Sequence, residues 1–380
     1  MTSRERVLNA LKHKEPDRVP FDLNGSLCSG IHVLAYKNLL SHLGLKTDRF
    51  VIHDTLQQLV WVDEEVLQKL AVDTRLIMPG SPSGWKLEIR PKDGGEFFVD
   101  TYGITWTRHA GGLYFDPTGY PLAQAGREDL QKYPWPDMSD PAIAQGLKER
   151  ARLWRENGRL VTVERPIGGF FEVGFWLRGY ENFYCDLAGD PDYAAALMDK
   201  CLELEMEYWR LMFSEIGDYI DVVLLANDLA AQNGPLISLE LFRKHIKPRL
   251  KRLNAFIKKL KSDAFISLHS CGAIHDLIPD LLETGVDIIN PVQVSAAGMD
   301  TRRLKKEFGR DVTFWGGGVD TQEILPRGSP QQVRDEVRRR IEDLAPGGGY
   351  VFAAVHNIQP DVPPQNIMAM WEALQEFGKY

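Results

Sequence analysis

The strongest constraint on this chain is a pattern after residue 145, in which helical stretches alternate with short apolar runs. Each run ends in polar or glycine residues, and the runs span residues 160–163, 222–225, 264–268, 287–289, 312–314 and 350–354. Helical spacing precedes or separates them, at 193–213, 239–260, 274–282, 302–308 and 330–344. This alternation predicts parallel strands that are joined by crossover helices.

The first part of the chain supplies the remaining strands. Apolar runs around Phe21 and at residues 73–78 raise the strand count to eight, which is the number in a closed (β/α)8 barrel. Residues 4–14, 31–43 and 54–70 have helical spacing. An open doubly wound sheet is the alternative, but its GxGxxG phosphate loop is absent. We therefore predict an α/β fold, a distorted TIM barrel.

Residues 80–120 differ from the rest, because short alternating runs are broken there by glycine-rich turns such as Asp93-Gly94-Gly95. An Asp-Gly pair between such runs is a hairpin signal. A segment this short could hardly maintain a hydrophobic core of its own. We therefore predict that it is a β-hairpin insertion on the barrel. The predicted organisation is a single domain over residues 1–380.

Charge and composition limit the kinds of molecule that this chain is expected to bind. The formal charge of -8 argues against nucleic acid, whose binders usually carry a basic face. No stretch approaches the roughly 20 apolar residues of a membrane span, and the first residues lack the pattern of a signal peptide, so a cytoplasmic location is expected. The four cysteines are too few and scattered for a disulfide framework. A small molecule or another protein is the expected partner, and a homodimer is possible.

Chemistry in a β/α barrel is placed where the strands end at their carboxyl side, because the loops there converge on one mouth. Every one of the six late runs is followed by chemically capable side chains or glycine. These residues are Glu164, Asn227, Asp228, His269, Cys271, Asn290, Gln293, Trp315, Gly316, His356 and Asn357. We predict catalytic roles for Asp228, Glu164 and Gln293. Cofactor contacts are predicted for Asn227, Asn290, Trp315, Gly316 and Asn357.

A metal site is predicted from His269, Cys271 and His356. His269 and Cys271 are two residues apart, so on a continuing strand both side chains leave the same face. Imidazole and thiolate together suit zinc, and a catalytic zinc needs three protein ligands and one open position. The plain alternative is a buried thiol beside a hydrogen-bonded histidine. Glu164 or Asp228 is an additional or supporting ligand, and the other three cysteines are ordinary thiols.

Simpler roles exist for several of these residues. Asp228 is also a typical helix cap, and Glu164 precedes Arg165, which makes a plain ion pair. The aromatic cluster that starts at Phe170 and Phe171 is mostly explained by helix packing. These two phenylalanines nevertheless follow a strand exit, where they could wall an apolar or planar ligand.

The chain resembles the uroporphyrinogen decarboxylase superfamily, which contains that decarboxylase and cobalamin-linked methyltransferases similar to methylcobalamin:coenzyme M methyltransferase. The resemblance lies in residues 4–11 and 16–20, in 233–238, and in 356–364. It implies a distorted TIM barrel. The methyltransferase branch carries a His-x-Cys zinc pair, which His269-Ser270-Cys271 matches. The branch has a cysteine as third ligand, whereas this chain has His356 there.

The decarboxylase branch is the less similar one. It carries an arginine-rich stretch after its first strand to hold the carboxylates of its tetrapyrrole, and residues 23–28 contain no arginine. The resemblance therefore implies a zinc-dependent methyltransferase. It would move a methyl group between a small substrate, preferably a methoxy-aromatic ether or else a thiol, and the corrinoid of a separate partner protein. Uroporphyrinogen decarboxylation and a non-catalytic binding barrel are the alternatives.

Overall fold

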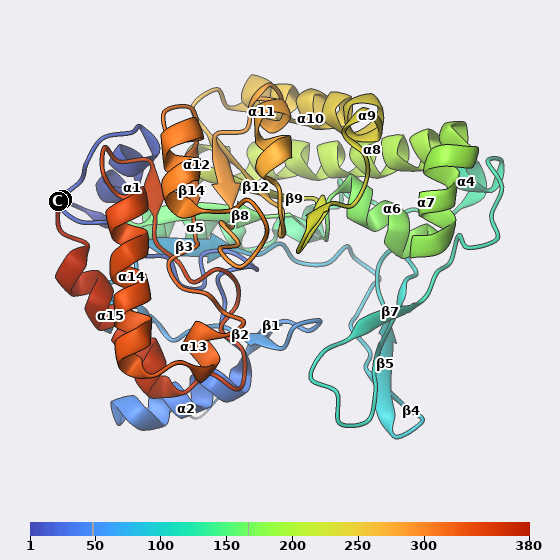
Figure 1. Cartoon of the computed structure of the whole chain (residues 1–380). Coiled ribbons are helices and arrows are strands. Elements are labelled where there is room, and N and C mark those ends of the chain that lie inside the picture. The colour runs from blue at the N-terminus through green and yellow to red at the C-terminus, as the bar shows by residue number, and fades with distance from the viewer. Residues whose placement is uncertain (48, 166) are drawn as a thin grey trace.

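The computed structural model describes residues 1–47, 49–165 and 167–380 (Figure 1). Its centre is a parallel sheet of seven strands in the order β15-β14-β13-β12-β9-β8-β3. The strands are β3 (Thr74–Ile77), β8 (Leu160–Glu164), β9 (Val222–Ala226), β12 (Phe265–His269), β13 (Ile288–Asn290), β14 (Thr313–Trp315) and β15 (Tyr350–Val351). All six late apolar runs and the weak run at 73–78 are therefore strands, which confirms the predicted fold class.

The eighth position is filled by the segment around Phe21, which is too irregular to form a full strand. Phe21 makes an isolated parallel bridge with Phe352. The Asp22 amide donates to the Phe352 carbonyl at 2.8 Å, and the Asp73 amide donates to the Phe21 carbonyl at 2.9 Å. The segment thus joins both edges of the sheet. Pro20 has no amide proton to extend this pairing, which is one reason why the barrel is distorted here.

Helices surround the sheet and fill the crossovers (Figure 1). The α-helices are α1 (Ser3–Leu11), α2 (Val33–Leu43), α3 (Glu64–Lys69), α4 (Asp129–Lys132), α5 (Leu147–Glu156), α6 (Phe170–Arg178), α7 (Tyr180–Gly189), α8 (Pro191–Ile216), α9 (Leu239–Leu241), α10 (Lys247–Leu260), α11 (Ile278–Leu282), α12 (Thr301–Phe308), α13 (Ile324–Arg327), α14 (Pro330–Leu344) and α15 (Pro364–Phe377). Among the described residues, no helix is long and apolar enough to cross a membrane.

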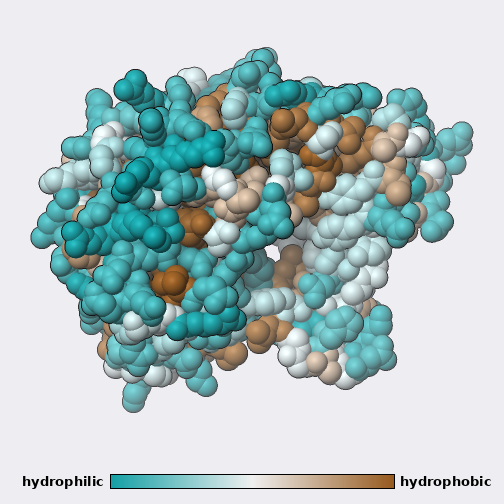
Figure 2. Space-filling model, viewed as in Figure 1, coloured by the Kyte–Doolittle hydropathy of each residue, from teal (hydrophilic) through white to brown (hydrophobic). Residues whose placement is uncertain are grey.

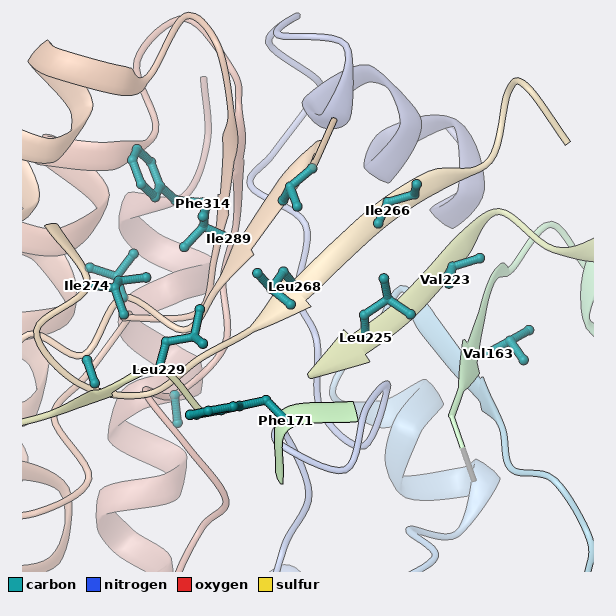
Figure 3. Packing of buried hydrophobic residues seen from close by; sticks show 14 of the residues in the cluster. Val163, Phe171, Val223, Leu225, Leu229, Ile266, Leu268, Ile274, Ile289 and Phe314 are labelled. Carbon is teal, nitrogen blue, oxygen red and sulfur yellow. The ribbon is translucent and has the colours of Figure 1, made fainter. Parts of the chain in front are cut away.

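Alternate residues of the strands divide the core into two clusters. The larger cluster contains Val163, Val223, Leu225, Ile266, Leu268, Ile289 and Phe314, together with Phe171, Leu229 and Ile274 from the segments that follow the strands (Figure 3). Burial of such a side chain stabilises the fold by about 1.5–3 kcal/mol. The smaller cluster contains the neighbouring residues Leu160, Val222, Leu224, Ile288 and Trp315, with Val7 and Leu11 of α1 packed against them.

Helix α1 lies at the amino ends of the strands. The Arg4 amide donates to the Gly158 carbonyl, and the Arg4 side chain pairs with Asp221; these two partners lie just ahead of β8 and β9. The carboxyl ends of the strands are therefore at the opposite end of the barrel, where the predicted site residues are.

The insertion is a four-stranded antiparallel sheet in the order β4-β5-β6-β7, which confirms the hairpin prediction. Its strands are β4 (Arg90–Lys92), β5 (Gly95–Val99), β6 (Thr105–Arg108) and β7 (Asp116–Gly119). Asp93 and Gly94 connect the first pair with φ angles of 48° and 76°, as a two-residue hairpin turn requires. The sheet projects from the barrel as an arm (Figure 1).

The helix predicted over residues 54–70 is wrong in its first part. Residues before α3 form a small hairpin of β1 (Ile52–Asp54) and β2 (Leu59–Val60). The Asp54 carboxylate accepts hydrogen bonds from the Leu56 and Gln57 amides, and Gln58 has a φ of 55°. Local bonding of this kind offers the backbone an alternative to the helix.

Candidate metal centre at the barrel mouth

The strands bring four predicted site residues to one end of the barrel interior. Glu164, His269, Asn290 and Trp315 are the last residues of β8, β12, β13 and β14. On their strands they lie on the same face as Leu160, Leu224 and Ile288, which belong to the smaller core cluster. Their side chains therefore point into the barrel, and all four are buried. Strand periodicity and parallel register together therefore create the site.

His269 is held in one orientation by Asn290. The Nδ1 atom of His269 lies 2.6 Å from the Asn290 Oδ1 atom, and the Asn290 Nδ2 atom donates to the Trp315 carbonyl at 3.0 Å. Because that second bond fixes which end of the amide is the acceptor, His269 must donate through Nδ1. Its Nε2 atom then carries the lone pair, which is the state of a metal-ligating imidazole with an outer hydrogen-bond partner.

The Nε2 lone pair faces a thiol and a carboxylate. Cys271 Sγ lies 3.4 Å from His269 Nε2, and Asp228 Oδ1 lies 3.8 Å from it. The Cys271 amide also donates to Asp228 Oδ1 at 2.9 Å, which ties the two loops together. Zinc bonds of about 2.0–2.3 Å in a tetrahedron place neighbouring ligands about 3.3–3.8 Å apart. The distances from His269 Nε2 to the other two donors therefore match the spacing of zinc ligands.

A second group shares His269. Ligand atoms of Cys28, His269 and His356 lie within 4.8 Å of one another, as do those of Asp228, His269 and Cys271. The His269 and His356 rings are 5.5 Å apart between centroids. The predicted set of His269, Cys271 and His356 does not form one such group among the described residues. Its members instead lie in two groups with His269 in common.

Cys28 is a donor that the sequence does not predict, because its local pattern is that of an ordinary thiol. It is buried in the loop that follows the Phe21 segment. The signal that identifies Cys28 is its position after the first strand, because that strand also ends at the barrel mouth.

Burial sets the protonation states of the donors at this site. Burial lowers the pKa of His269, and burial together with His269 lowers that of His356 to about 4, so both imidazoles are neutral and available as ligands. Burial raises the pKa of the Cys271 and Cys28 thiols well above the usual range, and Asp228 adds to this at Cys271. A cation would stabilise the thiolate that burial disfavours. Two imidazoles, two thiols and a carboxylate are a donor set that fits zinc.

Most other predicted residues lie at the mouth but are engaged by the protein. The Asn227 Oδ1 atom accepts from the Phe171 amide at 2.9 Å, and the Asn357 Oδ1 atom accepts from the Gly30 amide at 2.6 Å. Gln293 uses both ends of its amide, since it accepts from the Gly272 amide at 2.7 Å and donates to Gln232. These three side chains hold the loops at the mouth, and their predicted catalytic and cofactor roles stay predictions. The Asn227 Nδ2 atom is buried without a hydrogen-bond partner among the described residues.

Glu164, Trp315 and Gly316 also lie at the mouth and make contacts within the protein. The Glu164 carboxylate accepts from Arg165 at 2.5 Å and from the Leu27 amide at 3.0 Å, so it forms the ion pair considered as its simpler role. Trp315 donates from Nε1 to Asp22 at 2.7 Å. Gly316 has a φ of 94° beside the Asn290 amide. A cavity of about 10 Å³ between Cys28, Arg165 and His269 has room for about one water molecule.

Phe170 and Phe171 do not wall a ligand space. Both are buried, and Phe171 packs edge-on against Phe175 and Phe183. Helix packing, the simpler explanation of this aromatic cluster, therefore accounts for them.

Replacement of Asn290 by leucine should weaken zinc binding by about 10–100-fold, because His269 loses the acceptor that orients its ring. Competition with a chromophoric chelator measures this affinity. The Asn366→Leu variant is the matched control, since Asn366 is equally buried but bonds only to the Leu325 and Gly328 carbonyls. Equal affinity in wild type and Asn290→Leu would contradict the proposed role of Asn290.

Comparisons with known proteins agree with this fold. A family model described as uroporphyrinogen decarboxylase (URO-D) matches residues 123–377. The chain is 24% identical over 247 residues to a methylated-thiol–coenzyme M methyltransferase of Methanosarcina mazei, which is 64% of this chain and 61% of that protein. It is 24% identical over 190 residues to a uroporphyrinogen decarboxylase of Pelobacter propionicus, about half of each chain. The match thus spans about six tenths of the methyltransferase.

Among solved structures, a methyltransferase from Methanosarcina mazei superposes with a TM-score of 0.64. The superposition covers 99% of both chains at 19% identity. At this level of identity the similarity shows a common fold, including the distortion of the barrel.

Proposed function

Because this chain belongs to the uroporphyrinogen decarboxylase family, which its matched region establishes, we propose that it is a zinc-dependent methyltransferase. It moves a methyl group between a small substrate and the cobalt of a separate corrinoid protein. The observation that carries the proposal is the donor set around the buried His269, whose Nε2 atom faces Cys271 Sγ at 3.4 Å and Asp228 Oδ1 at 3.8 Å.

His269 and Cys271 form the centre of the proposed zinc site. Asp228 and His356, each grouped with His269, are the two candidates for the third ligand. When bound, zinc acts as a Lewis acid and lowers the pKa of the heteroatom that carries or receives the methyl group. This matters because the electron pair of the breaking bond between methyl and heteroatom stays on the heteroatom.

The chain's own residues keep that centre in place. Asn290 holds the His269 ring. Asp228 accepts a hydrogen bond from the Cys271 amide, and Gln293 accepts one from the next amide, that of Gly272. These two bonds fix the backbone at Cys271. Buried side chains at the strand ends keep bulk water away from the donors, which strengthens their interaction with a cation. The Asp228 side chain is 41% exposed, against 10% for His269, so Asp228 lies on the side from which a substrate would enter.

Decarboxylation of a polycarboxylate tetrapyrrole is the weaker candidate. Residues 23–28 contain no arginine. The one arginine that lines the small mouth cavity, Arg165, is paired with Glu164. A substrate with many carboxylates needs several free cations in its site.

For the methyl donor we propose a methoxy-aromatic ether, with a methylated thiol as the alternative. The name of the Methanosarcina relative supports the thiol, and the aromatic residues Trp85, Phe98 and Trp106, which line an apolar cavity of the insertion, support the ether. The test is incubation of the zinc-loaded enzyme with a reduced corrinoid protein and a panel of both donor classes, with the cobalt absorbance as readout. We expect a spectral change with at least one donor and none without enzyme.

Two outcomes would replace the proposal. Release of CO2 from uroporphyrinogen, with no spectral change for any methyl donor, would establish decarboxylation. A folded protein with neither activity and no bound metal would establish a non-catalytic binding barrel.

A further inference from the structure

A groove with a volume of about 740 Å³ lies on the flank of the barrel, where helices α3 and α5 line it. Leu67 and Gln68 belong to α3, and Leu153 and Trp154 belong to α5. Clefts of this size are typical of sites that bind small molecules. The metal centre makes no use of this groove.

The groove is distinct from the barrel mouth. Among the described residues, it shares no lining residue with the small cavity that Cys28 and His269 line. Arg159, which lines the groove, directly precedes β8, whereas Glu164 ends that strand at the mouth. Five residues of extended strand span about 16 Å. A ligand bound at Arg159 would therefore occupy a second site.

Arg159 gives the groove a positive charge that the protein does not neutralise. Among the described residues, its guanidinium donates to Ser3 Oγ at 3.0 Å and pairs with no carboxylate. Arg75 lines the same groove, but its guanidinium binds both carboxylate oxygens of Glu64, at 2.8 and 2.9 Å. Glu64, Arg75 and Arg159 are the charged residues of the lining, so one positive charge remains.

The surroundings of Arg159 favour a bound anion. Its side chain is partly buried, and this burial, together with the charge of Arg75, lowers the pKa of Arg159. Glu64 acts in the opposite direction, but its carboxylate is already paired with Arg75. A carboxylate matches the fork of a guanidinium and can accept two parallel N–H bonds from it. An anionic ligand would supply the partner that the fold leaves out.

The walls of the groove are aromatic and apolar. Trp61 and Trp154 both line it. Trp61 packs against His53, with 4.3 Å between the ring centroids, which holds this indole in place. Hydrophilic residues cover most of the barrel body on the face that Figure 2 shows, whereas Leu153 in the groove is an apolar residue that is 52% exposed. Such walls favour edge-to-face and offset contacts with a flat ring.

From these observations we propose that the groove binds an aromatic carboxylate, with the ring against the two indoles and the carboxylate on Arg159. The proposal does not depend on methyl transfer, because the site needs neither the metal nor a corrinoid partner. A cavity of about 150 Å³ accommodates one benzene ring, so this groove has room for two fused rings. The probe is 2-naphthoate, and 2-naphthamide has nearly the same shape without the charge.

Calorimetric titration of the purified protein at pH 7 compares the two ligands. We expect 2-naphthoate to bind wild type at least about tenfold more tightly than 2-naphthamide, because the amide cannot form the charged pair with Arg159. Equal affinities, or no binding of 2-naphthoate, would overturn the proposal.

Replacement of Arg159 by glutamine tests which cation holds the carboxylate. Arg159→Gln should weaken 2-naphthoate binding at least about tenfold and leave 2-naphthamide within about twofold of wild type, because the variant removes the charged contact alone. Arg150→Gln is the matched control, since Arg150 is exposed on α5 outside the lining and its loss changes the net charge equally. Unchanged 2-naphthoate affinity in Arg159→Gln would show that the carboxylate binds elsewhere, and it would remove the site.

Leu153→Glu tests the position of the ligand without a change at Arg159. The new carboxylate on an exposed wall should repel 2-naphthoate and weaken its binding at least about threefold more than that of 2-naphthamide. Leu260→Glu is the matched control, because Leu260 is exposed at the end of α10 and outside the lining, so both affinities should stay within about twofold. Thermal unfolding shows whether each variant is folded. Equal effects of Leu153→Glu and Leu260→Glu on 2-naphthoate would contradict binding in this groove.

Discussion

Replacement of His269 by alanine should abolish zinc binding and, with it, methyl transfer. His269 is the one residue common to both donor groups, so no set of three ligands within 4.8 Å survives its loss among the described residues. Wild type should contain about one zinc per chain, as expected for one three-ligand site. Elemental analysis after dialysis measures this directly, without any need for the substrate or the corrinoid partner.

Single variants of the other donors identify the remaining ligands. Cys271→Ser should lower zinc affinity strongly, because a hydroxyl is a much weaker zinc ligand than a thiolate. Loss of zinc in His356→Ala but not in Asp228→Asn would make His356 the third ligand, and the reverse result would select Asp228. Cys185→Ser is the matched control, because this cysteine is exposed and belongs to neither group. Full zinc content in both His269→Ala and Cys271→Ser would remove the metal centre from the proposal.

The regular part of the barrel could be predicted from the sequence because it depends on local patterns. Short apolar runs that end in polar residues specify strands, and a strand places alternate side chains on one face. This alternation predicts His269 and Cys271 as a pair, although β12 ends at His269 and Cys271 lies in the loop that follows. The contact between His269 and Asn290 was not, because it needs the relative register of β12 and β13, in which these two residues are paired.

Long-range closure explains what the sequence could not show. Cys28 approaches His269 only because the Phe21 segment joins β15 to β3 and brings its loop to the mouth, across 241 residues of chain. The hairpin at residues 52–60 replaced a helix because Val60 donates to the Ile31 carbonyl and Asp54 binds nearby amides. Neither effect leaves a periodic signal. Phe171 is a further example. Its position after a strand suggests a wall of a ligand site, but in the fold it packs against Phe175 instead.

Glu205 in helix α8 is an ionisable group that the fold buries without hydrogen bonds to its carboxylate. Neither carboxylate oxygen has a hydrogen-bond partner in the part of the chain that the structure describes. Burial raises the pKa of this carboxyl to about 7, although Arg165 and the nearby Trp209 indole act in the opposite direction. An unfolded glutamate titrates near 4.5. The folded protein therefore binds more protons than the unfolded chain between these two values.

Stability should consequently fall as the pH rises from about 4.5 to about 7, because ionisation of Glu205 costs more in the folded state. The shift of about 2.5 pH units corresponds to about 3 kcal/mol above pH 7. Glu172 adds to this trend, because burial and the Asp228 carboxylate raise its pKa to about 8. The stability conferred by a protonated Glu205 is thus fully present below pH 4.5 and lost above pH 7.

The Glu205→Gln variant carries a permanently neutral side chain of nearly the same shape. We expect it to be about 3 kcal/mol more stable than wild type at pH 8 and about equal at pH 4, as measured by urea unfolding. Glu203→Gln is the matched control, because Glu203 lies on the same helix with half of its side chain exposed, and it should change stability by less than about 0.5 kcal/mol. Equal stability of Glu205→Gln and wild type at pH 8 would mean that the folded protein ionises Glu205 without cost. The Arg165 guanidinium would then compensate its burial fully.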